Sequence, residues 1–169
     1  MEKYCRDSRV IRSSRVFPND FNNHDTLFGG RLLSDMDQVA SISAAKHSRL
    51  ECVTASVDTV EFLQPIRPTD SVTFESFVIW TGKSSMEVFI KVYAENLLSG
   101  DSKVASIAYF TFIALDKDGK PAPVPKIIPE TEEERYLYEK SKQRAEFRQD
   151  KKIHNKEIVS FLRSKYNAY

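Results

Sequence analysis

The stretch Asn22–Asp37 reads NNHDTLFGGRLLSDMD and runs from a polar, turn-rich loop through a Gly-Gly pair into an amphipathic helix. Apolar residues recur at helical spacing after the glycines, which predicts a helix from Gly29 or Gly30 to about His47. The first N–H groups of a helix have no intrahelical acceptor, and glycine has no Cβ to keep an incoming oxygen away. A carbonyl oxygen can therefore approach the N–H groups of Gly30 and Arg31, although the same pair can also be a plain turn into the helix.

The predicted helix carries two acids with different expected surroundings. Asp37 shares a face with apolar residues, where an ionised carboxylate is costly unless it has a partner; these neighbours are Leu33, Ala40 and Ala44. Asp37 is thus a candidate for acting on whatever the helix N-terminus polarises, or an acid that only hydrogen-bonds a neighbouring chain. Asp35 shares a face with Arg31 and Gln38 and is expected to be a solvated surface acid.

Polar residues outside this helix supply further candidates. Asn22 can orient a water molecule or a carbonyl without carrying charge, or it can simply form an Asx turn. His24 can be a general base, but a lone loop histidine is more often a surface residue. The turn Thr81–Ser85 holds a glycine, a lysine and two hydroxyls, a set that can bind a phosphate or form an ordinary charged hairpin. Asp58 can cap a bulge or face the same pocket.

Alternating apolar and polar residues predict strands at about 10–16, 52–63, 71–80, 85–96 and 103–115. The alternation changes sense near Asp58-Thr59, which indicates a β-bulge. Short connections predict an antiparallel meander, and the nearly all-apolar last strand is expected to be central. The long helix must bury its apolar stripe, and the sheet offers the only large apolar surface for it. The fold class is therefore α+β, with about five or six antiparallel strands around one long central helix.

The end of the chain predicts one more helix. Four prolines between Pro121 and Pro129 indicate an extended linker, and Thr131–Glu134 is a capping-box pattern that begins the helix. Because this helix has few apolar residues, we expect it on a surface or against a partner subunit. Its basic run, Lys140–Lys152, is expected to be a solvated face, with contact to nucleotide phosphates as the second interpretation.

The composition is that of a soluble globular domain, with 169 residues, a formal net charge of +1 and 41% hydrophobic residues. This charge gives no general attraction to nucleic acid or anionic lipid, and the apolar runs are too short to span a membrane. Residues 1–20 lack the apolar core of a secretory signal. Two cysteines, Cys5 and Cys52, suit a reducing cytoplasm, and three scattered histidines do not have metal-ligand spacing. We expect a cytoplasmic protein without a metal site.

Four segments, in order along the chain, resemble the hotdog-fold acyl-CoA thioesterases, in the branch of single-domain bacterial acyl-CoA hydrolases related to the two-domain cytosolic and brown-fat enzymes of animals. The segments are Asn22–Gly30 with Leu33–Asp37, Val53–Asp58 with Phe62–Ile66, Thr81–Val88, and Ala108–Phe112 leading to Asp118–Pro125. The resemblance implies a hotdog fold, with residues 1–129 as the acyl-CoA hydrolase domain and 130–169 as a C-terminal helical extension of it.

The resemblance also implies a function and a set of site residues. The family's catalytic asparagine falls on Asn22 and its catalytic acid on Asp37, and the two meet from opposite subunits of a homodimer. The helix N-terminus at Gly29, Gly30 and Arg31 polarises the thioester carbonyl. The turn residues Gly82, Lys83, Ser84 and Ser85 are similar to the family's CoA-contacting loop. Some members have histidine before Gly-Gly, where this chain has Phe28.

The expected reaction is hydrolysis of acyl-CoA to free CoA and a carboxylic acid, with Asp37 as general base or nucleophile. No metal or organic cofactor is required, and CoA belongs to the substrate. The acyl chain is expected beside the helix, near Leu33, Met36 and the strand at 53–62. The family implies a trimer of dimers without nucleic-acid or membrane partners. Two alternatives stay open: an enoyl-thioester hydratase, and a non-catalytic acyl-CoA-binding sensor.

Overall fold

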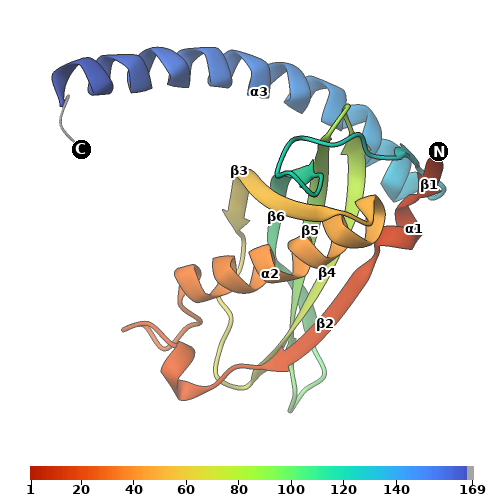
Figure 1. The fold of residues 1–169 in the computed structure, drawn as a ribbon. Helices are drawn as coiled ribbons and strands as arrows, with labels where there is room; N and C mark the ends of the chain where they lie inside the picture. The colour runs from red at the N-terminus through yellow and green to blue at the C-terminus, as the bar shows by residue number, and fades with distance from the viewer. Residues whose placement is uncertain (167–169) are drawn as a thin grey trace.

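A computed structural model of the chain describes residues 1–166 and has a five-stranded antiparallel sheet at its centre (Figure 1). The strand order is β2-β4-β5-β6-β3, so β2 and β3 form the two edges and β6 is internal, as predicted. The bounds are β2 (Val10–Arg15), β3 (Glu51–Phe62), β4 (Asp70–Thr81), β5 (Ser85–Asn96) and β6 (Ser102–Leu115). Each lies within two residues of the strand that the alternation predicts, and β4, β5 and β6 form the expected meander.

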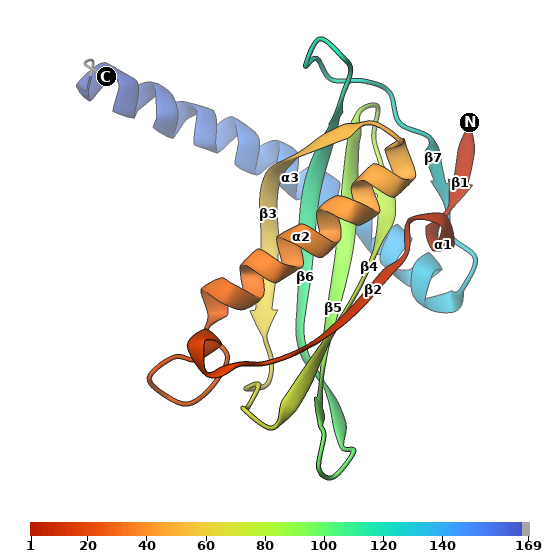
Figure 2. The same cartoon turned by 60° about the horizontal axis from the view of Figure 1, so that its bottom comes forward.

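The long helix α2 (Gly29–Ser48) lies across one face of this sheet (Figure 2). Its sheet-facing side chains include Leu32, Met36 and Val39, which are almost fully buried in one core with the apolar residues of β4, β5 and β6. The helix ends at Ser48, and the next residue, Arg49, caps it with a left-handed backbone (φ 59°). The expected α+β arrangement, a sheet around one central helix, is confirmed.

Strand β3 contains two bulges rather than one. The pairing register with β6 shifts between Thr54 and Ser56 and again between Val57 and Thr59, so the bulge predicted near Asp58 is confirmed and a second one precedes it. Asp58 accepts hydrogen bonds from Ser56 Oγ (2.8 Å) and Thr111 Oγ1 (2.7 Å), which satisfies the carboxylate at the bulge. Asp58 therefore caps the bulge, one of its two expected roles.

The N-terminal residues form elements that the sequence patterns did not indicate. Strand β1 (Glu2–Tyr4) pairs in parallel with β7 (Lys126–Ile128), which lies inside the segment predicted to be a linker. A single helical turn, α1 (Cys5–Ser8), follows β1, and a short 3₁₀ turn (Pro18–Asp20) precedes the loop that leads to α2. Strands β1 and β7 lie beside the C-terminal end of α2, where Lys3 Nζ donates to the carbonyl oxygen of His47 (2.6 Å) and His47 Nε2 hydrogen-bonds the Pro125 carbonyl (2.8 Å).

The C-terminal helix α3 (Glu132–Lys165) begins at the predicted capping box, in which Thr131 Oγ1 accepts the Glu134 N–H and the Glu134 carboxylate accepts the Thr131 N–H. It packs on the sheet face opposite α2, because it contacts Glu87 and Lys91, which alternate along β5 with core residues. Glu87 is 0% exposed and forms ion pairs with Arg144 and Arg148. Part of the basic run is therefore ion-paired rather than solvated.

Among residues 1–166, no helix is long and apolar enough to cross a membrane.

Candidate functional site

The N-terminus of α2 leaves backbone N–H groups open. The N–H groups of the first turn have no acceptor within the helix. Phe28, the residue before the helix, provides no side-chain cap for them either. A Cβ on Gly30 would lie 2.6 Å from Cε1 of Phe28, and one on Gly29 would lie 3.5 Å from Cζ of Phe62. The glycine pair therefore keeps the approach to these N–H groups clear, and the 56% exposed Phe28 ring lies beside it.

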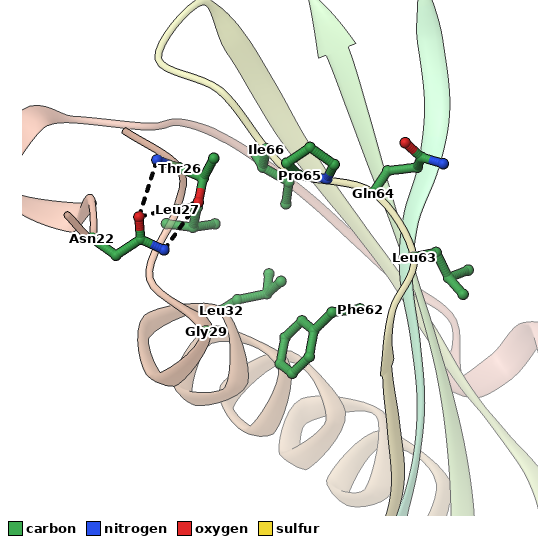
Figure 3. A pocket seen from close by; sticks show the side chains of 10 residues that line it. All are labelled: Asn22, Thr26, Leu27, Gly29, Leu32, Phe62, Leu63, Gln64, Pro65 and Ile66. Carbon is green, nitrogen blue, oxygen red and sulfur yellow. Dashed lines mark hydrogen bonds between the residues drawn. The ribbon is translucent and has the colours of Figure 1, made fainter. Parts of the chain in front are cut away.

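A cavity of about 280 Å³ lies beside this helix end (Figure 3). Its lining combines the loop before α2, the first turns of α2 and the segment after β3: Asn22, Thr26, Leu27, Gly29, Leu32, Phe62, Leu63, Gln64, Pro65 and Ile66. The lining is mostly apolar with a few polar groups, as in sites for small molecules. Leu32 lines this cavity, whereas Met36 is fully buried in the core.

Asn22 lies at the rim of this cavity and organises its own loop (Figure 3). Its Oδ1 accepts the N–H groups of His24 (2.9 Å) and Thr26 (3.3 Å), and its Nδ2 donates to Thr26 Oγ1 (3.0 Å). The Asx turn that the sequence left open is thus present, at a position that also borders the cavity. His24 is exposed at the loop surface.

Asp37 lies farther along α2, half-buried and next to strand β3. Its Oδ1 accepts a hydrogen bond of 2.8 Å from Thr54 Oγ1. Thr54 was not among the residues singled out from the sequence. Thr54 is exposed on β3, where threonine is a common strand residue, so no local pattern distinguishes it from the other threonines.

The prediction for Asp35 is wrong. Its side chain is buried rather than solvated, with the residue 8% exposed, and it accepts hydrogen bonds from Arg12 Nη2 (2.7 Å) and Arg31 Nε (3.1 Å). The Arg31 partner is the expected i, i+4 neighbour, but Arg12 comes from the edge strand β2. Asp35 is therefore a structural acid that ties α2 to the sheet edge.

Sequence comparison identifies the family. Residues 24–100 match the model of the thioesterase superfamily. The acyl-CoA thioester hydrolase YkhA of Bacillus subtilis, described as uncharacterized, is 52% identical over 160 residues, which is 95% of this chain and 93% of that one. The chain belongs to the thioesterase superfamily. It also matches the human cytosolic acyl coenzyme A thioester hydrolase at 37% identity, spanning 76% of this chain and about a third (34%) of that longer protein.

Solved structures of thioesterases share this fold. An acyl-CoA hydrolase from Bacillus cereus superposes with a TM-score of 0.92 at 53% identity, over 95% of this chain and 98% of that one. One from Staphylococcus aureus, solved with butyryl coenzyme A, coenzyme A and coenzyme A disulfide, has a TM-score of 0.92 at 37% identity, over 96% and 99% of the chains. It was also solved with single aspartate, asparagine or threonine residues replaced by alanine. A hexameric acyl-CoA thioesterase matches at 39% identity and a TM-score of 0.87, over 89% and 96%.

The turn that resembles the CoA-contacting loop of thioesterases lies at the other end of the sheet from the N-terminus of α2. Ser85 pairs with Ile113, next to the pairing of Glu51 with Leu115, whereas the opposite end of β3, at Phe62, lies beside Gly29. Lys83 is exposed at the tip, and Gly82 N–H donates to the Ser85 carbonyl (2.9 Å). One chain therefore does not bring Gly82, Lys83, Ser84 and Ser85 to its own Gly-Gly pair.

The edge strand next to the site presents apolar side chains to solvent. Val53, Val57 and Phe62 on β3 are 47%, 40% and 58% exposed, and Ile42 on α2 is 47% exposed. Unpaired strand edges with apolar side chains are typical of surfaces that pair with another chain. Within residues 1–166, no three His, Cys, Asp or Glu side chains gather as a metal centre requires.

Proposed function

We propose that this thioesterase hydrolyses acyl-CoA to free CoA and a carboxylic acid, with Asp37 as the catalytic acid and Asn22 of a second subunit as its partner. The observation that carries the assignment is the hydrogen bond between Thr54 and Asp37. In the three S. aureus variants, the replaced asparagine, aspartate and threonine are 15 and 17 residues apart in that order. Asn22, Asp37 and Thr54 have the same two spacings.

The second subunit enters through strand β3. Pairing two copies of β3 antiparallel about a two-fold axis extends the sheet and covers the exposed side chains of this edge. With the axis near the middle of β3, the Phe62 end of one copy lies next to the Glu51 end of the other. Asn22 and the Gly-Gly pair of the partner subunit then come to the end that carries Asp37, Thr54 and the Gly82–Ser85 turn.

The chemistry at this shared site uses side chains and backbone dipoles. The N–H groups of Gly29, Gly30 and Arg31 donate to the oxygen that becomes negative as the thioester is attacked, which is worth about 3–4 kcal/mol for a well-placed donor. Asp37 either takes a proton from the attacking water or attacks the carbonyl carbon itself to form an anhydride. Asn22 positions the water or the carbonyl. Gly82, Lys83, Ser84 and Ser85 hold the phosphates of CoA.

The proposal also includes an assembly, a domain division and a cellular location for the enzyme. The homodimer is the smallest active unit, and three dimers form a hexamer, as hexameric structures of related thioesterases support. Residues 1–129 form the hydrolase domain and 130–169 its helical extension, of which 167–169 lie outside the described residues. The enzyme acts in the cytoplasm, with acyl-CoA as its substrate and without a metal or organic cofactor.

The test measures CoA thiol release from acyl-CoAs of increasing chain length. We expect Asp37→Asn and Asn22→Ala to lower kcat by orders of magnitude with the oligomer intact. Asp35→Asn is the matched control on the same helix: it removes an ion-paired acid and is expected to lower the melting temperature more than kcat. Near-normal turnover of Asp37→Asn contradicts the assignment. Hydration of an enoyl thioester without thiol release favours the hydratase, and tight binding without turnover favours the sensor.

Mixed dimers test the shared site. Subunits carrying Asp37→Asn and Asn22→Ala are each nearly inactive alone, but a heterodimer of the two has one site with both residues intact. We expect purified heterodimers to regain up to about half of the wild-type activity, since one of two sites is complete. Heterodimers of verified composition that stay inactive contradict a site built from two subunits.

A further inference from the structure

Helix α3 leaves its own subunit at the edge of the sheet. Arg148 is its last residue that contacts the domain: it pairs with Glu87 on β5 and, at 3.5 Å, with Asp58 on the edge strand β3. The described residues after Arg148 are all exposed. Both views show this part of the helix extending past β3 (Figures 1 and 2). At 1.5 Å per residue, the segment 149–165 continues for about 25 Å beyond the edge.

A line of exposed apolar side chains runs along one side of α3. Tyr136, Phe147 and Ile158 are 61%, 73% and 44% exposed and follow each other at intervals of 11 residues. Eleven residues are almost three helical turns, so the three side chains lie nearly above one another. We call them the lateral line. Phe147 is adjacent to Arg148 in sequence, which places the lateral line about 100° round the helix from the side that contacts the sheet.

The lateral line is centred on the point where α3 crosses the sheet edge. Phe147 is its middle member and precedes the last domain contact, Arg148, by one residue. The two-fold axis of the proposed β3 pairing lies at this same edge. Rotation about that axis places two α3 helices antiparallel and side by side on the outer face of the joined sheet. Each Phe147 then faces its equivalent, and each Tyr136 faces Ile158 of the partner subunit.

We propose that α3 is a dimer clasp: it pairs antiparallel with α3 of the second copy across the β3 edge, with Phe147 at the two-fold axis. This inference rests on the β3 pairing of the proposed shared site, and it assigns the exposed half of α3 to the same partner. The occupant is a second copy because the line is symmetric about the edge, as an isologous contact requires. An aromatic side chain removes about 150–250 Å² from water when buried, so this pairing covers a substantial apolar area.

Disulfide trapping tests the clasp on the full-length chain. Facing residues of two helices packed about 8–10 Å apart bring their Cα atoms within the 4.4–6.8 Å that a disulfide requires. We expect Phe147→Cys to give covalent dimers under mild oxidation. Tyr136→Cys/Ile158→Cys should also link, while either single variant should not. The controls are the wild-type chain, with its buried Cys5 and half-buried Cys52, and Glu146→Cys, which is exposed on a different side of the same turn.

A second measurement applies if the cysteine variants do not fold. Phe147→Asp should raise the concentration at which the dimer dissociates by at least about tenfold, and Glu146→Gln should not. Equal linking of Phe147→Cys and Glu146→Cys, or a dimer unaffected by Phe147→Asp, overturns the clasp. Binding of the wild-type chain to phosphatidylserine vesicles, without linking at Phe147→Cys, assigns α3 to a membrane instead.

The outcomes separate the clasp from the shared active site. If mixed Asp37→Asn and Asn22→Ala dimers regain activity but Phe147→Cys does not link, the shared site stands and the clasp is wrong. If the chain is monomeric and active, both fail. If Phe147→Cys links but mixed dimers stay inactive, two copies do pair through α3 and the distribution of catalytic residues must be revised.

Discussion

Glu87 offers the sharpest test of how α3 is held on the sheet. Its carboxylate is 0% exposed and accepts from Arg144 Nε and Nη2, both at 3.0 Å, and also from Arg148. Glu87→Gln keeps the shape of the side chain but removes the charge that both guanidinium groups neutralise. Removing one partner of a buried ion pair costs about 3–5 kcal/mol.

The structure indicates that the effect of Glu87→Gln falls at or just below the lower end of this range. Arg144 and Arg148 keep 22% and 17% of their side-chain exposure, so water can solvate part of each guanidinium after the change. We therefore expect Glu87→Gln to lower the free energy of unfolding by about 2–3 kcal/mol. For a domain of this size, each kcal/mol lowers the melting temperature by about 2–4 °C, which predicts a drop of about 4–12 °C.

The assay is thermal and urea unfolding followed by circular dichroism, at one protein concentration because the assembly contributes to stability. The matched control is Glu133→Gln. Glu133 pairs with Lys91 at 2.6 Å but its side chain is 45% exposed, and exposed pairs contribute about 0–1 kcal/mol. If Glu87→Gln costs no more than Glu133→Gln, the buried ion cluster does not hold α3 and the reasoning is wrong.

Three further predictions concern the site and the core. Thr54→Val removes the 2.8 Å hydrogen bond to Asp37. A hydrogen bond to a charged group is worth about 1.5–3 kcal/mol, so this variant should lower kcat about 10- to 100-fold. The control Thr59→Val, on the same strand, should leave kcat unchanged. Gly82→Ala would place a Cβ 2.6 Å from Ser85 Oγ and should raise KM for acyl-CoA several-fold, whereas Gly100→Ala, at a φ of 80° with open space around it, should lower only the melting temperature. Burial lowers the pKa of His47 below its usual 6.5, so the unfolded chain binds a proton at this residue more readily than the folded chain. The free energy of unfolding therefore decreases as the pH drops below 6.5. Between pH 7.5 and pH 5, the melting temperature should fall less in His47→Gln than in the wild-type chain.

Much of the fold could be predicted from the sequence because its main elements have local signatures. The period of α2 and the alternation in the five strands arise from residues that face one shared core, so each element shows its buried side in its own sequence. The pairing of β1 with β7 has no such signature. Each of these strands has three residues, and their partners are more than 120 positions apart.

The acids of α2 show why local patterns predicted the site only in part. The helical wheel put Asp37 on the apolar face and Asp35 on the solvent face, because it records spacing and not what covers each face. In the fold, Arg12 from β2 covers Asp35, a contact between residues 23 positions apart. Asp37 instead lies towards the open edge at β3, where Thr54 reaches it from 17 positions away. Long-range contacts of this kind leave no periodic trace in a sequence.

The spacing along α2 supports the proposal that Asp37 and the polarising helix end of one active site come from different copies. Asp37 is eight residues after Gly29, which places their backbones about 12 Å apart along the axis. Reacting atoms must come within about 3–3.5 Å of each other, and one aspartate side chain does not cover the difference even though helical side chains tilt towards the N-terminus. A carbonyl held at the Gly-Gly pair is therefore beyond the reach of Asp37 in the same chain. Antiparallel pairing at β3 removes this mismatch, because it sets the N-terminus of one α2 against the middle of the other.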